Sequence, residues 1–422
     1  MTNTLSRRIG RMLHMDFDYV AQGGAWLALD HGVNVATSIA TTVVLTNVIT
    51  KEIYGSYTWL LGIFMLLLPL TLSGVSNAMI RSIARGNEGT LWRGTRTRMI
   101  GGFAVTLVLA GVSVFFYYTN RAELAWVTAA VCVVYPFAFA ADDYKSYYHA
   151  RREFARYAVV NSAVNTFVCL STISAAFLSG SLLAILGANM TARGIGNAAS
   201  FFLAWSGRKN DDVDPEFGSF GRNLSIVAAI NNVSFTIDQV LVGSLFSMEI
   251  MASYGLATRL SEPFRVLGIL INRLAWPKAV KMGGVEAARK FFSKFFVLLV
   301  VLAVMALAVL AVFPFLIKWV FPRYTDAIPL TFLMVVSSLL SVLVTYLETF
   351  YISQDHLRRF FYAASTVRPA LTILLMLPFI HWWGFYGAVY ARLLVRLGAT
   401  VVLCARMIPE RGMPPKDGAG GS

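Results

Sequence analysis

The sequence predicts an all-α membrane protein in which about twelve helices cross the bilayer. Hydrophobic residues make up 57% of the 422 residues, charged residues only 14%, and the mean hydropathy is +0.63. With glycine counted in place of tyrosine, the apolar share is about 60%, whereas soluble domains hold roughly 45–50%. The apolar residues also occur in stretches of about 20, the length of one span. This composition leaves no room for a large soluble catalytic domain.

Twelve stretches are long and apolar enough to span a membrane, with more polar segments between them. A helix rises about 1.5 Å per residue, so about 20 residues cross a hydrocarbon core of roughly 30 Å. In chain order, the predicted spans are 21–46, 56–78, 99–118, 123–142, 156–178, 182–205, 223–245, 250–272, 295–316, 329–352, 361–380 and 384–405.

The basic residues indicate how these spans are oriented. Lys and Arg number 36 and Asp and Glu 22, which gives a net charge of +14. In a soluble protein this excess would suggest nucleic-acid binding, but the cytoplasmic loops of membrane proteins also collect basic residues. With the N-terminus inside, 26 basic residues, Arg98 among them, fall in inner segments and four in outer segments. We therefore expect both termini in the cytoplasm and no nucleic-acid partner.

A polar segment divides the spans into two sets of six. We predict an N-lobe at 1–206, a cytoplasmic linker at 207–222, a C-lobe at 223–405 and a cytoplasmic tail at 406–422. A shift of 197 residues aligns Asn34 with Asn231 and Tyr57 with Tyr254, and further matches keep the same order. Because each lobe has an even number of spans, both enter from the same side. This predicts two six-helix lobes related by a parallel pseudo-twofold repeat around a central cavity.

Six arginines lie inside predicted spans: Arg193, Arg259, Arg265, Arg368, Arg392 and Arg396. An arginine at the centre of a membrane helix costs about 2.5–3.5 kcal/mol by insertion scales. Arg392 and Arg396 share one helix face at roughly 12 and 18 Å inside the last span, and Arg193 has a similar depth in the sixth. Guanidinium groups stay charged and match phosphate oxygens, so we predict that these residues bind an anionic substrate. The alternative is that each one snorkels or pairs structurally.

Polar residues form a stripe along the first span and recur in the seventh. A polar stripe on an apolar helix must face a wet cavity or another helix, so we predict that Asn34 and Asn231 contact the substrate. Asp30, Asp238 and Glu348 can titrate, and we predict that they couple transport to a proton or cation. The alternative for each carboxylate is a structural role as the counter-charge of a buried arginine.

Motifs for enzymatic chemistry are missing from the sequence. It has no G-x-x-x-x-G-K-[ST] phosphate loop, which argues against an ATPase. Asp142 and Asp143 end the fourth span without a second carboxylate cluster, so we expect a solvated helix end. The five histidines lack metal-ligand spacing, and the three cysteines lack paired spacing. We predict no enzymatic activity, no catalytic residue, no metal and no cofactor.

The segment around the second span resembles a known transporter signature. It contains Glu-x-Tyr-Gly at 52–55, Gly74 near the end of the span, and then Arg81-Ser82. Further similarity lies in 254–260, at Pro277 and in 384–388. These motifs resemble the polysaccharide transport family of Wzx-type O-antigen and oligosaccharide flippases, within the multidrug/oligosaccharidyl-lipid/polysaccharide exporter superfamily.

The resemblance implies a multi-pass transporter of the bacterial inner membrane that moves undecaprenyl-diphosphate-linked oligosaccharides by alternating access. Such a protein would supply the synthesis of surface polysaccharide, including the O-antigen of lipopolysaccharide and exopolysaccharide. It would contact membrane lipids and function as a monomer, with polysaccharide polymerase and glycosyltransferases as partners. Two features depart from other branches: the first two spans lack a midplane Arg or Lys, and twelve spans argue against the fourteen-span lipid II flippases.

Two other functions remain open from the sequence. A cation-coupled multidrug-type exporter of the same fold would need an acidic, aromatic cavity, whereas arginines predominate among the charged residues within the spans. A membrane-embedded polysaccharide polymerase usually needs a sizeable outer loop, and the longest outer segment here is about a dozen residues near 318–328.

Overall fold

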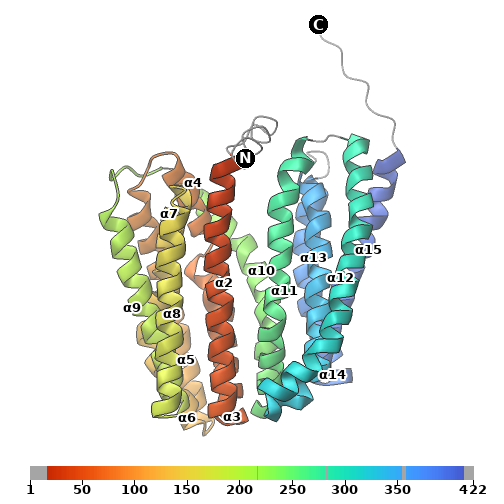
Figure 1. The fold of residues 1–422 in the computed structure, drawn as a ribbon. Helices are drawn as coiled ribbons and strands as arrows, with labels where there is room; N and C mark the ends of the chain where they lie inside the picture. The colour runs from red at the N-terminus through yellow and green to blue at the C-terminus, as the bar shows by residue number, and fades with distance from the viewer. Residues whose placement is uncertain (1–16, 216, 282–283, 354–357, 413–422) are drawn as a thin grey trace, which may run out of the picture. The chain divides into compact units, whose positions relative to one another are not determined.

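The computed structural model describes residues 17–215, 217–281, 284–353 and 358–412, and every long element among them is a helix. Helices satisfy all their backbone hydrogen bonds internally, which is why they suit the membrane. In the first half the elements are α2 (Phe17–Val48), α3 (Lys51–Leu67), η1 (Leu68–Thr71), α4 (Val75–Ala84), α5 (Thr90–Tyr118), α6 (Ala122–Ala140), α7 (Tyr144–Ala150), α8 (Phe154–Leu178) and α9 (Leu182–Ser206). In the second half they are α10 (Phe217–Leu245), α11 (Met248–Lys281), α12 (Gly284–Val320), η2 (Pro322–Ala327), α13 (Ile328–Ser353), α14 (Arg358–Trp383) and α15 (Phe385–Gly412) (Figure 1).

The all-α membrane fold predicted from the sequence is confirmed. Eleven of the twelve predicted spans each fall on one long helix, whereas the span 56–78 runs over α3, η1 and the start of the short helix α4. Within the described residues, seven helices are long and apolar enough to cross a membrane by those two criteria. Helices α2, α10 and α11 are not among the seven, and they carry polar residues that the sequence analysis singled out.

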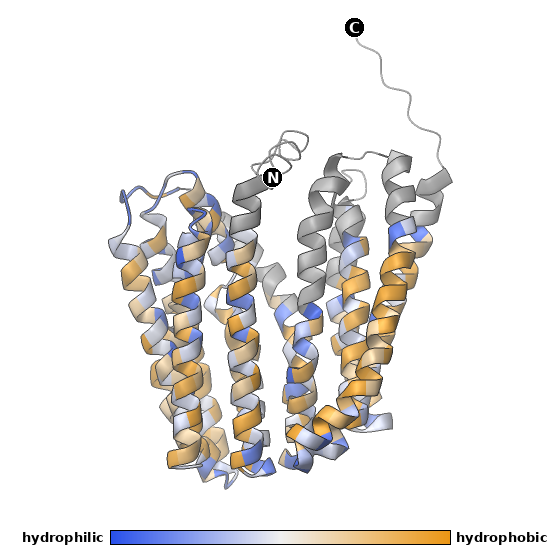
Figure 2. Cartoon of the chain, viewed as in Figure 1, coloured by the Kyte–Doolittle hydropathy of each residue, from blue (hydrophilic) through white to orange (hydrophobic). Residues whose placement is uncertain are grey.

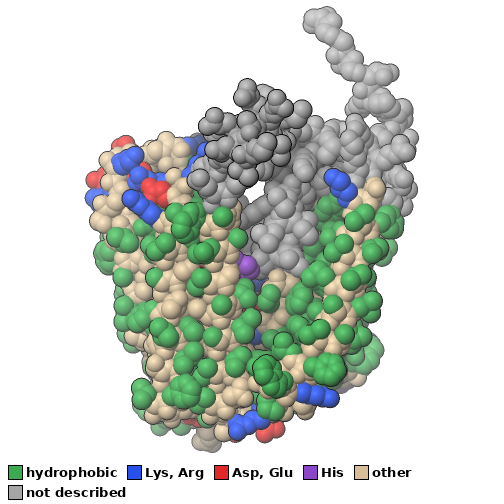
Figure 3. Space-filling view, viewed as in Figure 1, with side chains coloured by type: hydrophobic (Ala, Val, Ile, Leu, Met, Phe, Trp, Pro, Cys, Tyr) green, Lys and Arg blue, Asp and Glu red, His purple; other side chains and the backbone are tan. Residues whose placement is uncertain are grey.

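Apolar side chains on the outer faces of the helices are exposed, as lipid contact requires. Along α12, exposed residues include Val297, Leu307, Phe315 and Trp319. Figure 2 shows hydrophobic residues along most of the coloured part of this helix. In Figure 3, the charged side chains gather at one end of the first half of the chain, and hydrophobic ones cover the faces of the helices below. This distribution is typical of a protein whose helices are surrounded by hydrocarbon.

The chain forms two compact units that are each described by themselves. Unit 1 contains the described residues up to Ile49 and Phe64–Asn232, and unit 2 contains Thr50–Ile63 and the described residues from Val233 onward. These units are defined by contacts, so the predicted lobe boundaries at 206 and 223 stay predictions. Helix α3 begins in unit 2 and ends in unit 1.

The helix pairings of the two units agree with a repeat. In unit 1, α5 packs against α6, α6 against α9, and α8 against α9. In unit 2, the helices at the corresponding places pair in the same way, namely α12 with α13, α13 with α15, and α14 with α15. When the six long helices of each half are numbered in chain order, the third packs against the fourth, the fourth against the sixth, and the fifth against the sixth in both halves. Such matching supports the parallel repeat inferred from the sequence.

The predicted span 56–78 is interrupted, which differs from the continuous helix that we expected. Helix α3 ends at Leu67, a 3-10 turn containing Pro69 follows, and Leu72 adopts a left-handed backbone conformation with φ of 56°. Proline has no N–H to continue the helical ladder, so the carbonyl of Met65, four residues earlier, loses its usual donor. The side-chain amide of Asn232 in α10 donates to this carbonyl at 2.7 Å.

Other side chains from neighbouring helices complete the ends of broken helices in unit 1. Tyr135 donates its hydroxyl proton to the carbonyl of Phe64 at 2.9 Å, at the end of α3. Pro136 breaks the ladder inside α6, and the hydroxyl of Thr106 donates to the freed carbonyl of Cys132 at 3.0 Å. Because water is excluded from hydrocarbon, such donors are what make a broken helix tolerable in a membrane.

The beginning of the predicted linker is bonded to the rest of unit 1. Glu88 accepts a hydrogen bond from the backbone N–H of Lys209 at 2.7 Å, and Asn210 accepts one from the backbone N–H of Glu88 at 3.0 Å. Arg151 donates to the carbonyl of Gly207 at 3.0 Å. These bonds hold the segment after α9 against the turn between α4 and α5.

The close packing of α5 against the interrupted span yields a stability prediction. A Cβ at Gly101 would lie 2.5 Å from the carbonyl oxygen of Leu70, whereas a Cβ at Gly111 on the same helix would meet nothing within 4 Å. We expect Gly101→Ala to cost about 1–3 kcal/mol, since the backbone of the turn must move. Gly111→Ala should be neutral or slightly stabilising, because alanine favours helix. Thermal unfolding of the purified protein in detergent measures both, and equal midpoints would contradict this packing.

Candidate functional site

Unit 2 brings together most of the arginines that the sequence placed inside the membrane. Arg392 on α15 forms an ion pair with Asp238 on α10, with 2.5 Å between Nη2 and Oδ1, and also donates to the carbonyl of Phe235. Asp238 is fully buried and accepts a second hydrogen bond from the hydroxyl of Tyr254 on α11. A buried carboxylate with a cation and a hydroxyl as partners is well stabilised, and removal of either would leave a costly charge.

Arg396 lies one turn further along α15 and has different partners. Its guanidinium donates to the carbonyl and to the hydroxyl of Ser337 on α13, the latter at 2.6 Å. The nearby positive charges of Arg392, Arg368 and Arg265 repel it, and Asp238 attracts it. Arg396 is thus a cation that donates hydrogen bonds to neutral acceptors and that lies among other cations.

The remaining arginines of unit 2 have partners on neighbouring elements. Arg368 on α14 pairs with Glu348 on α13 at 2.6 Å, and its side chain is 24% exposed. Arg265 is exposed, and its guanidinium carbon lies 5.2 Å from the ring centre of Phe235, a cation–π contact. Four arginines therefore act in one neighbourhood with two carboxylates, Asp238 and Glu348. We call Arg265, Arg368, Arg392 and Arg396 the arginine group.

Arg259 stands apart from this group. It pairs with Glu262, one turn away on the same helix α11, at 3.4 Å. Structural pairing is the alternative to substrate binding for each arginine, and Arg259, Arg368 and Arg392 all have a carboxylate partner. Pairing does not exclude substrate contact, because their side chains keep exposed fractions of 37%, 24% and 13%.

The predicted polar residues of the first and seventh spans differ in their surroundings. Asp30 is buried in unit 1 and accepts hydrogen bonds from Asn161 at 2.8 Å and from Ser162 at 3.4 Å. Asn161 in turn accepts one from the hydroxyl of Tyr144 at 3.0 Å. Asn34 is exposed on α2. The side chain of Asn231 lies outside the described residues, so its predicted role stays a prediction.

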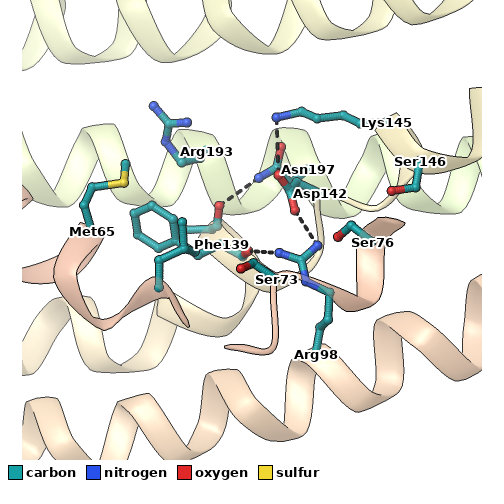
Figure 4. Close-up of a pocket in the computed structure, with 12 residues that line it drawn as sticks. Met65, Ser73, Ser76, Arg98, Phe139, Asp142, Lys145, Ser146, Arg193 and Asn197 are labelled. Carbon is teal, nitrogen blue, oxygen red and sulfur yellow. Dashed lines mark hydrogen bonds and ion pairs between the residues drawn. The ribbon is translucent and has the colours of Figure 1, made fainter. Parts of the chain in front are cut away.

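Arg193 lies at a cavity of about 310 Å³ whose lining residues all belong to unit 1. Figure 4 shows this cavity beside the interrupted second span, with Ser73 and Ser76 on one side and Arg193, Asn197 and Lys145 on the other. Asn197 donates to the carbonyl of Ala138 at 2.8 Å, near the end of α6. The cavity thus collects polar groups where two helices end.

One wall of the cavity contains a buried charge cluster that the sequence analysis misassigned. Arg98 is only 4% exposed; it pairs with Asp142 at 2.8 Å and with Asp143, and donates to the carbonyl of Phe139. Arg98, one of the basic residues assigned to the inner segments, lies within helix α5. The expectation of a solvated helix end is wrong for Asp143, which is 1% exposed and also accepts hydrogen bonds from Ser76 and Thr95. Asp142 lies just after the end of α6, and 29% of its side chain is exposed.

A signal for this cluster was present in the sequence. Consecutive spans joined by a short loop run antiparallel, so the start of the third span lies beside the end of the fourth. Arg98 stands at the first of these positions and Asp142 with Asp143 at the second. Opposite charges on the two helices at the open end of such a hairpin indicate an ion pair more than a topology signal.

Residues 20–276 match the family model described as polysaccharide biosynthesis protein, which is more than half of the chain. The chain belongs to this family. No curated protein matches this sequence.

Solved structures show which fold this chain has. It is similar to the lipid II flippase MurJ in an inward closed conformation, with a TM-score of 0.68 and 11% identity, over 91% of this chain and 87% of that one. It is also similar to an inward-facing multidrug resistance MATE family transporter of the MOP superfamily, with a TM-score of 0.64 and 11% identity, over 91% and 98% of the two chains. A MOP superfamily transporter from Pyrococcus furiosus gives 0.58 and 12%, over 94% and 96%. The expected exporter fold is confirmed, and the chain is a multi-pass membrane protein.

The Arg98–Asp143 ion pair gives a second prediction. Arg98→Ala should cost about 3–5 kcal/mol, because it leaves a buried carboxylate without its cation. Asp143→Ala should cost a similar amount, and the double variant should cost less than the sum, since neither charge is then left alone. Chemical denaturation in detergent measures all three. Arg93→Ala, an exposed arginine on the same helix, is the matched control, and additive effects of the two buried substitutions would refute the coupling.

Proposed function

We propose that this protein moves an undecaprenyl-diphosphate-linked oligosaccharide across the bacterial inner membrane by alternating access, with both termini in the cytoplasm. The arginine group of unit 2 carries this proposal. Its four guanidinium groups exceed the two carboxylates beside them, so the surroundings favour an anion with two negative charges. A diphosphate supplies such an anion and offers oxygens that match the forked donors of arginine.

The family supports the same reading of the substrate. A polysaccharide biosynthesis protein with an exporter fold would serve that synthesis by moving a lipid-linked intermediate, such as a precursor of O-antigen or exopolysaccharide. The apolar tail of such a molecule would stay in lipid, while the diphosphate meets the arginines and the glycan meets polar helix faces. Translocation of this kind breaks no covalent bond, and the protein would hand its product to a polysaccharide polymerase after glycosyltransferases have built it.

Asp30 is the best candidate of the three carboxylates for coupling transport to an ion. Asp238 and Glu348 each pair with an arginine, so a role as counter-charge accounts for their burial. Asp30 instead accepts hydrogen bonds from the neutral side chains of Asn161 and Ser162. A cation bound beside Asp30 would stabilise a buried carboxylate that has neutral donors, whereas Asp238 and Glu348 already have a guanidinium as partner.

The decisive test uses Arg396, because its substitution leaves no carboxylate without a partner. Arg396→Gln should weaken the binding of undecaprenyl diphosphate roughly 10- to 100-fold, since hydrogen bonds to charged groups contribute about 1.5–3 kcal/mol. Arg396→Lys should retain part of the affinity, because the charge remains while the fork is lost. Binding is measured on purified protein, and transport by the surface polysaccharide of a bacterial strain that lacks its own transporter.

Arg323→Gln is the matched control, because Arg323 is exposed in η2. It should bind and transport as the unaltered protein does. Unchanged binding and unchanged polysaccharide in Arg396→Gln, at normal protein levels, would remove the arginine group from the mechanism. Export of small cationic compounds by the unaltered protein, with no effect of undecaprenyl diphosphate, would favour a multidrug-type exporter.

A further inference from the structure

The cavity of unit 1 is lined by more positively than negatively charged side chains. Arg98, Lys145 and Arg193 line it, and Asp142 is the one carboxylate among its lining residues. Asp143 lies behind this wall, where Arg98, Ser76 and Thr95 already bond to it. The negative charge of Asp143 is therefore balanced by partners behind the lining residues. An anion in the cavity would meet a lining with net positive charge.

Lys145 is able to turn toward such an anion. Its ammonium lies 3.3 Å from Asp142, a long contact, and 35% of its side chain is exposed. Asp142 has a second and shorter ion pair, with Arg98 at 2.8 Å. An ammonium can therefore be shared between Asp142 and a ligand without leaving the carboxylate alone. Figure 4 shows Lys145 and Arg193 on the side of the cavity opposite Ser73 and Ser76.

Neutral donors surround the same space. Ser73, Ser76 and Ser146 contribute hydroxyl groups, and the interrupted backbone of residues 68–74 forms the adjoining wall. Non-helical backbone at membrane depth is tolerated where it lines a cavity, and such breaks commonly form ligand sites. A volume of about 310 Å³ is at the small end of the range for ligand sites and suits a compact headgroup.

We propose that this cavity binds a phosphate group, with Lys145 and Arg193 as its principal cationic contacts. The phosphate would come from the headgroup of an anionic membrane lipid or from free phosphate. With the predicted topology, Lys145 stands at the inner end of the fourth span, where basic pockets between helices bind anionic headgroups. The inference goes beyond the proposed function, because every lining residue belongs to unit 1 and no cargo is needed to define the site.

Thermal unfolding of the full chain in lipid nanodiscs tests the proposal. Three conditions are compared: phosphatidylcholine alone, phosphatidylcholine with phosphatidylglycerol, and phosphatidylcholine with inorganic phosphate. A ligand that binds only the folded protein raises the unfolding midpoint with its concentration. We expect phosphatidylglycerol to raise the midpoint by several degrees. Lys145→Gln and Arg193→Gln should each lose at least half of this shift, and Arg93→Gln, an exposed arginine outside the cavity, should retain it.

The outcomes separate the sources of phosphate and can overturn the site. A shift with phosphatidylglycerol alone supports a lipid headgroup, and a shift with inorganic phosphate that both variants lose supports a free anion. No shift in either condition, or equal losses in the two variants and in Arg93→Gln, would overturn the proposal. If Lys145→Gln or Arg193→Gln unfolds before it can be measured, Lys145→Arg replaces it and should keep the shift. No oligosaccharide is present, so failure here leaves the proposed transport untouched.

Discussion

The interaction on which the rest of the structure depends is the bond between a polar side chain and a backbone carbonyl that its own helix has left without a donor. Hydrocarbon offers no water to replace a missing N–H, so each break in a helix requires a donor from another helix. In unit 1 these bonds are Asn232 to Met65, Thr106 to Cys132, Asn197 to Ala138 and Arg98 to Phe139. They add polar contacts between helices where Pro69 and Pro136 interrupt the ladder and where α6 ends.

The same constraint explains how the charges are arranged. An arginine inside a membrane protein needs acceptors, and here these are carboxylates, hydroxyls and carbonyls in varying proportion. Arg98 uses two carboxylates and a carbonyl, Arg392 one carboxylate and a carbonyl, and Arg396 a carbonyl and a hydroxyl. From Arg98 to Arg392 to Arg396, fewer carboxylates are bonded to the guanidinium, so less of its positive charge is balanced. Arg98 is consequently part of the framework, whereas Arg396 keeps the field that an incoming phosphate would meet.

Sequence reasoning found the helices because the length of a span and the exclusion of charge are properties of the chain itself. It also found the arginine group and its carboxylates, Asp238 and Glu348, although it had to leave open whether the carboxylates couple an ion or balance a charge. It missed the buried role of Arg98, because a basic residue near the start of a span reads as a loop residue until its tertiary partner is known. It missed the interruption at Pro69 for the same reason: a proline inside an apolar stretch is tolerated or disruptive depending on which side chain reaches the freed carbonyl.

Asn232 shows how this bonding complicates the comparison of related proteins. It follows Asn231, a residue with a predicted role in substrate contact. The Asn232 side-chain amide, however, donates to the carbonyl of Met65, which Pro69 leaves without its usual donor more than 160 positions earlier in the chain. In a family of such transporters, the two positions would tend to change together, so that a chain without the proline is free to lose the amide. Correlated substitution between them would then report backbone architecture and carry no information about the cargo. Polar residues within the spans should therefore be sorted by their main-chain partners before any of them is assigned to substrate specificity.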